Sequence, residues 1–138
     1  MKTSVSINWL DKMAFEGEAD GHKFIFDADP KVGGEGRGFR PKQFMMYALA
    51  GCTAMDVISI LKKMRVEVEA FHVEVESELT EEHPKHYTSA HIIFTFKGKD
   101  LPMEKLEKAV NLSEERYCGV STVYKKVMPV TTEIRIEE

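Results

Sequence analysis

Cysteine is scarce in this chain of 138 residues, which holds only Cys52 and Cys118. There is no CxxC pair, and the five histidines lie far from both cysteines in the sequence, so we expect no bound metal and no other cofactor. In a cytosolic protein, two cysteines are more often catalytic, redox-active or inert than joined in a structural disulfide. The two thiols are therefore candidates for a functional role.

An excess of positive charge is also missing. The formal net charge is -4, so no broad basic surface is expected and nucleic acid is not a predicted partner. The first eighteen residues hold no sustained apolar core, which argues against a signal peptide or an anchor. The longest apolar stretch is interrupted by Thr53, Asp56 and Ser59, so we expect no membrane partner and a cytoplasmic location.

The remaining composition is that of an ordinary soluble protein. Hydrophobic residues make up 43% and charged residues 30% of the chain, with no internal repeat and no low-complexity tract. A chain of this length is enough for one domain with a moderate core. We therefore expect a single domain over residues 1–138.

The stretch from Pro41 to Arg65, PKQFMMYALAGCTAMDVISILKKMR, predicts a long helix. Proline suits the first helical position because its missing N–H would be unpaired there, and no other proline follows in the stretch. Apolar residues fall on nearly all faces, which predicts a helix buried in the middle of the fold. Cys52 lies at its centre.

Alternating apolar and polar residues predict six strands, in residues 5–9, 12–18, 23–27, 66–79, 88–97 and 130–136. Two further helices are expected, one from Pro102 and one from Ser113, as N-cap, to about Val127, which carries Cys118. The order βββ–α–ββ–αα–β separates strands from helices and favours an α+β fold with mainly antiparallel pairing. Residues 29–40 contain four glycines and predict a mobile loop, either a solvated connector or a loop that lines a site.

Two nearby thiols would allow a defined redox reaction. A thiolate can attack the O–O bond of a peroxide and become a sulfenic acid, which a second thiol converts to a disulfide that an external dithiol must reduce. The first thiol needs a lowered pKa, which a cationic neighbour or a helix N-terminus provides. The alternative is simpler, since free cysteines are among the most buried residues and often only fill space.

Two segments resemble the OsmC/Ohr family, and most of all its YhfA-like branch: Pro41 to Val57, with the run Ala-Gly-Cys-Thr-Ala, and LSEERYCGVS at residues 112–121. The resemblance covers essentially the whole chain, including the order of its elements. It implies an intertwined homodimer with two central helices back to back, sheets wrapped around them and active sites at the subunit interface. Active members reduce organic hydroperoxides, which would make Cys52 the peroxidatic thiol and Cys118 the resolving one.

The sequence departs from the family pattern near the start of the central helix. Family peroxidases carry a glutamate nine or ten residues before the first cysteine, where this chain has Gln43 and Lys42. That glutamate holds an arginine from upstream, which stabilises the thiolate and orients the peroxide. The only upstream arginines here are Arg37 and Arg40, which either serve with Gln43 as a neutral partner or are solvent-exposed charges. Lys42 is a possible substitute cation.

The resulting prediction is a thiol-dependent hydroperoxide reductase that uses a small-molecule hydroperoxide and an external dithiol reductant. Cys52 would attack, Cys118 would resolve, and Arg37 or Arg40 would assist with Gln43 near by. Asp56, one turn beyond Cys52, is expected to serve as a capped or dimer-contact residue rather than in catalysis. Two other functions stay open: a non-enzymatic dimer that binds a small apolar ligand, and a redox sensor.

Overall fold

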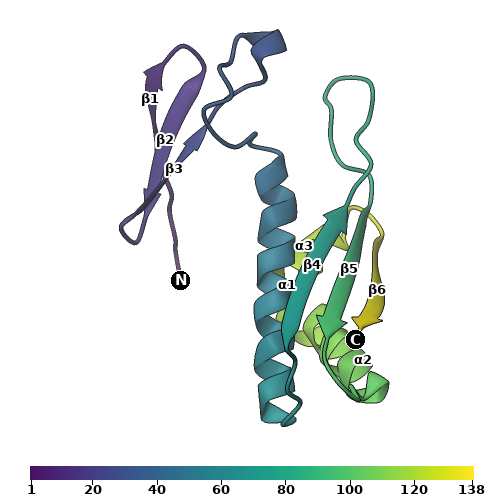
Figure 1. The fold of residues 1–138 in the computed structure, drawn as a ribbon. Helices are drawn as coiled ribbons and strands as arrows, with labels where there is room; N and C mark the ends of the chain where they lie inside the picture. The colour runs from purple at the N-terminus through teal and green to yellow at the C-terminus, as the bar shows by residue number, and fades with distance from the viewer. The chain divides into compact units, whose positions relative to one another are not determined.

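The computed structural model describes all of residues 1–138 and has an α+β fold with two three-stranded sheets (Figure 1). The predicted order βββ–α–ββ–αα–β is confirmed. The elements are β1 (Ile7–Asp11), β2 (Ala14–Ala19), β3 (His22–Phe26), η1 (Pro30–Val32), α1 (Gln43–Lys63), β4 (Ala70–Glu76), β5 (Ala90–Lys97), α2 (Met103–Leu112), η2 (Ser113–Tyr117), α3 (Gly119–Tyr124) and β6 (Val130–Glu137).

The chain divides into two compact units, Met1–Met45 and Met46–Glu138, and each is described by itself. The first unit contains the antiparallel sheet β1-β2-β3. The predicted turn between β2 and β3 is present, with positive φ angles at Asp20 (51°) and Gly21 (82°). An Asp-Gly pair tolerates these angles, which explains why the hairpin closes there.

Aromatic side chains form the centre of the first unit. Phe26 and Phe44 pack edge to face with ring centroids 4.7 Å apart, and Phe24 and Phe39 lie against the same Phe44 ring at 5.4 and 5.1 Å. Such rings bury large apolar areas and prefer tilted contacts. The cluster joins the hairpin to the residues that lead into α1.

The glycine-rich loop of residues 29–40 is more organised than the expected mobile connector. The carboxylate of Asp27, which is buried, accepts hydrogen bonds from the backbone N–H groups of Ala28 (2.7 Å), Glu35 (3.2 Å) and Arg37 (3.0 Å). Gly34 lies so close to the backbone of Ala28 that a Cβ atom there would overlap it. The loop is therefore shaped by one buried acid and by close backbone packing.

The second unit contains the sheet β4-β5-β6. β4 and β5 form the predicted antiparallel hairpin, whereas β6 pairs with β5 in parallel, so the pairing is mainly antiparallel, as expected, with the closing strand as the exception. A parallel neighbour needs a long crossover connection, and α2, η2 and α3 supply one. Alternation along residues 130–136 predicts the strand but carries no information on its direction.

α1 buries only one row of side chains: Leu49, Thr53, Val57 and Leu61, which recur every four residues. The expectation of a helix buried on nearly all faces was therefore wrong for the single chain, since Met55 on another face is 73% exposed. By length and composition α1 could cross a membrane, a test that core helices of soluble proteins also pass. Its buried row packs into the core of an α+β sheet domain.

The core of the second unit lies where α1, α2 and the sheet meet. Alternate side chains of β5, namely Ile92, Phe94 and Phe96, are fully buried in the same cluster as Leu61 of α1 and Leu106 of α2. Alternation places these β5 side chains on one face of the strand. This shared core fixes α1 against the segment that carries the second cysteine, because Cys118 belongs to the same cluster.

The predicted second helix of the crossover is not continuous. Ser113 does not begin a new helix, because α2 runs directly into η2, a single π-helical turn. The backbone is then extended at Cys118 (φ −76°, ψ 100°), and α3 starts one residue later. Cys118 therefore lies between two helical segments rather than within one, which corrects its expected position.

Candidate thiol site

The two cysteines, remote in the sequence, lie side by side in the second unit. The Sγ atoms of Cys52 and Cys118 and a carboxylate oxygen of Asp56 all lie within 4.8 Å of one another. Both cysteines are free thiols. Cys52 and Asp56 are four residues apart on α1 and so point from the same helix face. The site therefore combines Cys52 and Asp56 from one face of α1 with Cys118, which lies between η2 and α3.

The π-helical turn is what presents Cys118 to α1. Its backbone N–H donates a hydrogen bond of 2.7 Å to the carbonyl oxygen of Ser113, which closes the wider turn. The Sγ atom accepts a contact of 3.4 Å from the N–H of Ser121 at the start of α3. A π-turn inserts an extra residue into a helix and often occurs at functional sites. Here it turns the thiol toward Cys52.

The two thiols differ in exposure. Cys118 is fully buried, whereas Cys52 is half-buried. Burial is the main cause that raises the pKa of Cys118 to about 12, and the hydrogen bond to Cys52 adds to the increase. Cys118 is therefore a neutral thiol at physiological pH, and Cys52 is the thiol that a dissolved molecule can reach.

A chain of hydroxyl groups holds Asp56 in place. The Oγ atom of Ser113 donates a hydrogen bond of 3.0 Å to Oδ2 of Asp56. Oγ1 of Thr53 lies 2.8 Å from the same Ser113 oxygen, and because serine has one proton to give, Thr53 is the donor in this contact. Both hydroxyl groups are fully buried, so the chain fixes the carboxylate of Asp56 beside the thiols.

A second acid, Glu114, belongs to the π-helical turn and is 7% exposed. Its Oε1 accepts a hydrogen bond of 2.7 Å from Oγ of Ser121 and lies 3.8 Å from Nζ of Lys125. Lys125 also donates to the main-chain oxygen of Glu114 at 2.7 Å. The positive charge of Lys125 is therefore directed to Glu114, and the charged group placed beside the thiols is the carboxylate of Asp56.

The other predicted site residues belong to the first unit. Arg37 is held by three carboxylates, with Asp11 at 2.7 Å and with Asp27 and Glu35 at 3.5 Å each. The hydrogen bond from Arg37 is the main cause that lowers the pKa of the Asp11 carboxyl. This arginine is therefore committed to local ion pairs.

Arg40 is less firmly held than Arg37. Its guanidinium donates to the carbonyl oxygen of Gly38 at 3.2 Å and lies 3.9 Å from the carboxylate of Asp29. Gln43 is the first residue of α1, about two and a half helical turns before Cys52, and Lys42 precedes it and is exposed. The roles of Arg37, Arg40 and Gln43 at the thiols stay predictions.

Sequence reasoning missed Ser113 and Glu114 and gave Asp56 only a structural role. The four-residue spacing of Cys52 and Asp56 was a usable signal, because it places both on one helix face. Ser113 and Glu114 lie within the Cys118 motif of residues 112–121, but nothing local shows that Ser113 reaches Asp56. That contact joins positions 57 residues apart.

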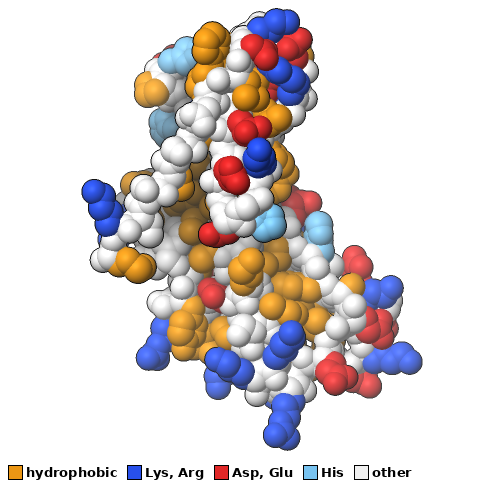
Figure 2. Space-filling model, turned by 90° about the vertical axis from the view of Figure 1, so that its left-hand side faces the viewer, with side chains coloured by type: hydrophobic (Ala, Val, Ile, Leu, Met, Phe, Trp, Pro, Cys, Tyr) orange, Lys and Arg blue, Asp and Glu red, His pale blue; other side chains and the backbone are white.

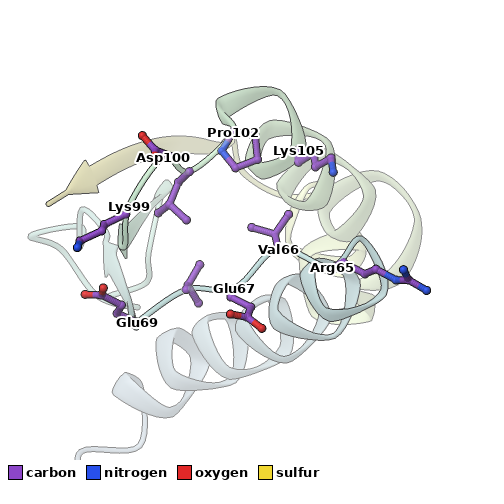
Figure 3. Close-up of a pocket in the computed structure, with 10 residues that line it drawn as sticks. Arg65, Val66, Glu67, Glu69, Lys99, Asp100, Pro102 and Lys105 are labelled. Atoms are coloured by element: carbon purple, nitrogen blue, oxygen red, sulfur yellow. The ribbon is translucent and has the colours of Figure 1, made fainter.

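One cavity of the second unit lies away from the two cysteines. It has a volume of about 490 Å³ and is bounded by the segment after α1 and the residues before α2 (Figure 3). Arg65 and Lys105 lie on one side of it, and Glu69 and Lys99 lie on the other. Neither cysteine lines this cavity, and its charges are of both signs, so it does not enlarge the thiol site.

Comparison with known proteins places the chain among proteins that share this fold. It is 35% identical to "Protein YhfA" of Escherichia coli over 126 residues, which cover 91% of each chain. A hypothetical protein from Aquifex aeolicus has a TM-score of 0.86 at 26% identity, covering 99% of this chain and 98% of that one.

A more distant structure is an organic hydroperoxide resistance protein from Elizabethkingia anophelis, with a TM-score of 0.70 at 13% identity, covering 99% of this chain and 100% of that one. At that identity the likeness shows the fold alone. Residues 34–133 match the family model described as "OsmC-like protein", a span that includes both cysteines. The chain therefore belongs to the OsmC-like protein family.

Proposed function

We propose that this protein is a thiol-dependent peroxidase that reduces organic hydroperoxides through Cys52 and Cys118. The observation that carries the proposal is the meeting of a half-buried thiol and a fully buried one within 4.8 Å. An accessible thiol can meet the peroxide, and a buried neighbour can trap the product before further oxidation. Membership of the OsmC-like protein family supports this assignment, and the fold is shared with an organic hydroperoxide resistance protein.

The reaction runs in three steps. The thiolate of Cys52 attacks one oxygen of the hydroperoxide, the O–O bond breaks, and the alkoxide takes a proton to leave as an alcohol, with Cys52 oxidised to a sulfenic acid. The thiolate of Cys118 then attacks the sulfenic sulfur, the S–S bond forms, and the leaving hydroxide takes up the proton that Cys118 released and becomes water. An external dithiol supplies two electrons and two protons to restore both thiols.

Cys118 must lose its proton before the second step. Its raised pKa keeps it a thiol while Cys52 reacts, so a proton acceptor is needed once the sulfenic acid has formed. The carboxylate of Asp56 lies within 4.8 Å of both sulfurs and is oriented by Ser113. We assign to Asp56 the acceptance of this proton.

The first step needs a positive charge near Cys52. A cation beside a cysteine favours the thiolate form that attacks the peroxide, and in the family this cation is an arginine. Arg37 is already paired with three carboxylates, whereas Arg40 has one distant acidic partner. We therefore assign the assisting role to Arg40 rather than Arg37, with Gln43 as its neutral hydrogen-bond partner.

Two further expectations belong to this proposal. The protein would be cytoplasmic, and it would act as a homodimer because exposed apolar side chains lie on a face of α1 that the core leaves uncovered. Figure 2 views the side of the protein that lies on the left in Figure 1 and shows hydrophobic side chains gathered in the lower half of the picture. Met55 and, near the end of the crossover, Val127 are 73% and 79% exposed. Extended apolar patches commonly mark interfaces.

The test uses the reduced protein with tert-butyl hydroperoxide and a dithiol in excess. We expect turnover in the wild type, none in Cys52→Ser, and in Cys118→Ser a sulfenic acid on Cys52 that a dimedone-type reagent captures for mass spectrometry. Arg40→Ala should slow the first step, and Arg37→Ala, compared at equal folded fraction, should affect it less. Turnover that survives Cys52→Ser would overturn the proposal, as would a wild-type protein that is inert with every dithiol tried.

A further inference from the structure

We propose that Cys52, Asp56 and Cys118 also form a binding site for a thiophilic divalent cation, with Zn²⁺ as the expected ion. The proposal concerns the reduced site alone and does not require peroxidase turnover. Its basis is the convergence of two sulfurs and one carboxylate from separate segments on one point. The sequence contains no spaced metal motif, because only the fold brings these donors together.

The distances suit a tetrahedral ion. Zinc binds thiolate sulfur at about 2.3 Å and carboxylate oxygen at about 2.0–2.2 Å, which places two sulfurs of one tetrahedron about 3.8 Å apart. The three donor atoms here lie within 4.8 Å of one another, so they need to close by about 1 Å or less around the ion. Rotation of the half-buried Cys52 side chain can provide this closure.

The charges of the second unit favour a cation at this point. All three donors are anionic when they bind a metal, and a second acid, Glu114, belongs to the π-helical turn that leads to Cys118. Lys125 is turned to Glu114, at 3.8 Å from its carboxylate and 2.7 Å from its main-chain oxygen. A divalent ion would balance the charge of two thiolates and leave Asp56 as the third ligand.

Neighbouring groups already orient two of the three ligands. Ser113, itself fixed by Thr53, donates to Oδ2 of Asp56, which leaves Oδ1 for the ion. The N–H of Ser121 donates to Sγ of Cys118, an arrangement that supports a thiolate. Such outer contacts fix ligand geometry in metal sites and are costly to remove.

The three ligands also determine which ion is favoured and whether one coordination position stays open to water. Soft thiolates favour zinc and copper(I) over magnesium and calcium, which prefer oxygen ligands. Three protein ligands leave the fourth tetrahedral position to water, as in zinc sites that stay open. Cys52 is half-buried, so the ion has a route in from solvent on its side.

Zinc binding and disulfide formation exclude each other at this site. With a hydroperoxide as oxidant, the two bound thiolates give up two electrons and join as a disulfide. The peroxide takes those electrons and two protons and becomes an alcohol and water, and the zinc leaves as the aqueous ion. Reduction of the disulfide by a dithiol restores the ligands.

The experiment uses the full chain, reduced, treated with a chelator and kept without oxygen. Zn²⁺ is titrated against a chromophoric chelator, and Co²⁺ replaces Zn²⁺ to give the visible absorption of tetrahedral thiolate coordination. We expect one ion per chain, loss of the cobalt spectrum in Cys52→Ser and Cys118→Ser, and affinity lowered about tenfold or more by Asp56→Asn and by Ser113→Ala. Asp100→Asn, an exposed acid remote from the thiols in sequence, should match the wild type.

Two results would overturn the proposed zinc site. One is the absence of stoichiometric zinc binding by the reduced wild type, and the other is an unchanged zinc affinity in Asp56→Asn and in both cysteine variants. Should a cysteine variant fail to fold, the disulfide form of the wild type takes its place, and it must bind no zinc until it is reduced. Peroxidase turnover without zinc binding would remove only this proposal. Stoichiometric zinc binding without turnover would support it and remove only the proposed function.

Discussion

At the scale of single residues, the two cysteines of the site differ in solvent exposure, and its acid is held by hydrogen bonds. Cys52 is reachable and Cys118 is sealed, while Asp56 gains its position from a hydroxyl group that belongs to another segment. Ser113 is the residue that joins these parts, because it receives a hydrogen bond from Thr53 and passes one to Asp56. Its removal is therefore a direct test of the arrangement.

Ser113→Ala should lower the free energy of unfolding. The change leaves a buried hydroxyl of Thr53 without its acceptor and the carboxylate of Asp56 without its donor, which typically costs about 1–3 kcal/mol. Chemical denaturation of the reduced protein measures the loss. Ser59→Ala, at an exposed position of α1, is the matched control and should change little. An equal effect of both substitutions would contradict the hydrogen-bonded chain.

The sequence predicts the pairing of the two cysteines better than it predicts the residues that surround them. Each lies in a recognisable run of residues, so their pairing is predictable from resemblance, whereas residue spacing alone leaves a space-filling role open. Ser113 looked like a helix N-cap because serine before two glutamates is typical of one. Its contact with Asp56 depends on how the crossover returns to α1, and no local pattern encodes that return.

At the scale of elements, local pattern predicts the strands and helices but not how they join. Alternation placed the six strands near their observed positions, and the proline-led apolar stretch placed α1 within two residues at each end. The π-helical turn escaped prediction because no local pattern in its five residues, SEERY, distinguishes it from an α-helical turn. The parallel pairing of β6 escaped for the related reason that strand direction follows from the crossover.

The loop of the first unit offers a test at this scale. Three backbone N–H groups and Arg37 surround the carboxylate of Asp27, and the hydrogen bond from the N–H of Arg37 is the main cause that lowers its pKa. A lowered pKa in the folded state means that Asp27 stabilises the fold above its unfolded pKa. That contribution is lost as the pH falls through the folded pKa.

Asp27→Asn should therefore destabilise the protein at neutral pH and reduce the loss of stability on acidification. Unfolding curves recorded from pH 7 down through the acidic range, for wild type and variant, measure both effects. Asp20→Asn is the matched control, since asparagine tolerates the positive φ of that turn position. Parallel pH profiles for wild type and Asp27→Asn would contradict the assigned role of the loop.

At the scale of the whole molecule, α1 presents two different surfaces. One row is sealed in the core of the second unit, and another face carries Met55, which is 73% exposed. A helix with apolar residues on most faces normally has most faces covered. The exposed face therefore favours the homodimer proposed above.

Met55→Glu should convert the dimer to monomers, because a buried unpaired carboxylate opposes association. Light scattering coupled to size-exclusion chromatography measures the mass of each form. Met103→Glu places the same change on α2, where the first turn of a helix accepts an acid, and should leave the mass unchanged. A wild-type protein that is monomeric at micromolar concentration would refute the dimer.

The side-by-side course of β5 and β6 has a consequence for biosynthesis. β5 holds the centre of its sheet, yet the strand that covers its second edge is made only after the whole helical crossover has been translated. Until then one edge of β5 has unpaired backbone N–H and C=O groups, next to the apolar side chains of Ile92, Ile93 and Phe94. Unpaired strand edges of this kind promote aggregation. This edge of β5 is therefore completed only when β6, the last strand of the chain, has been made.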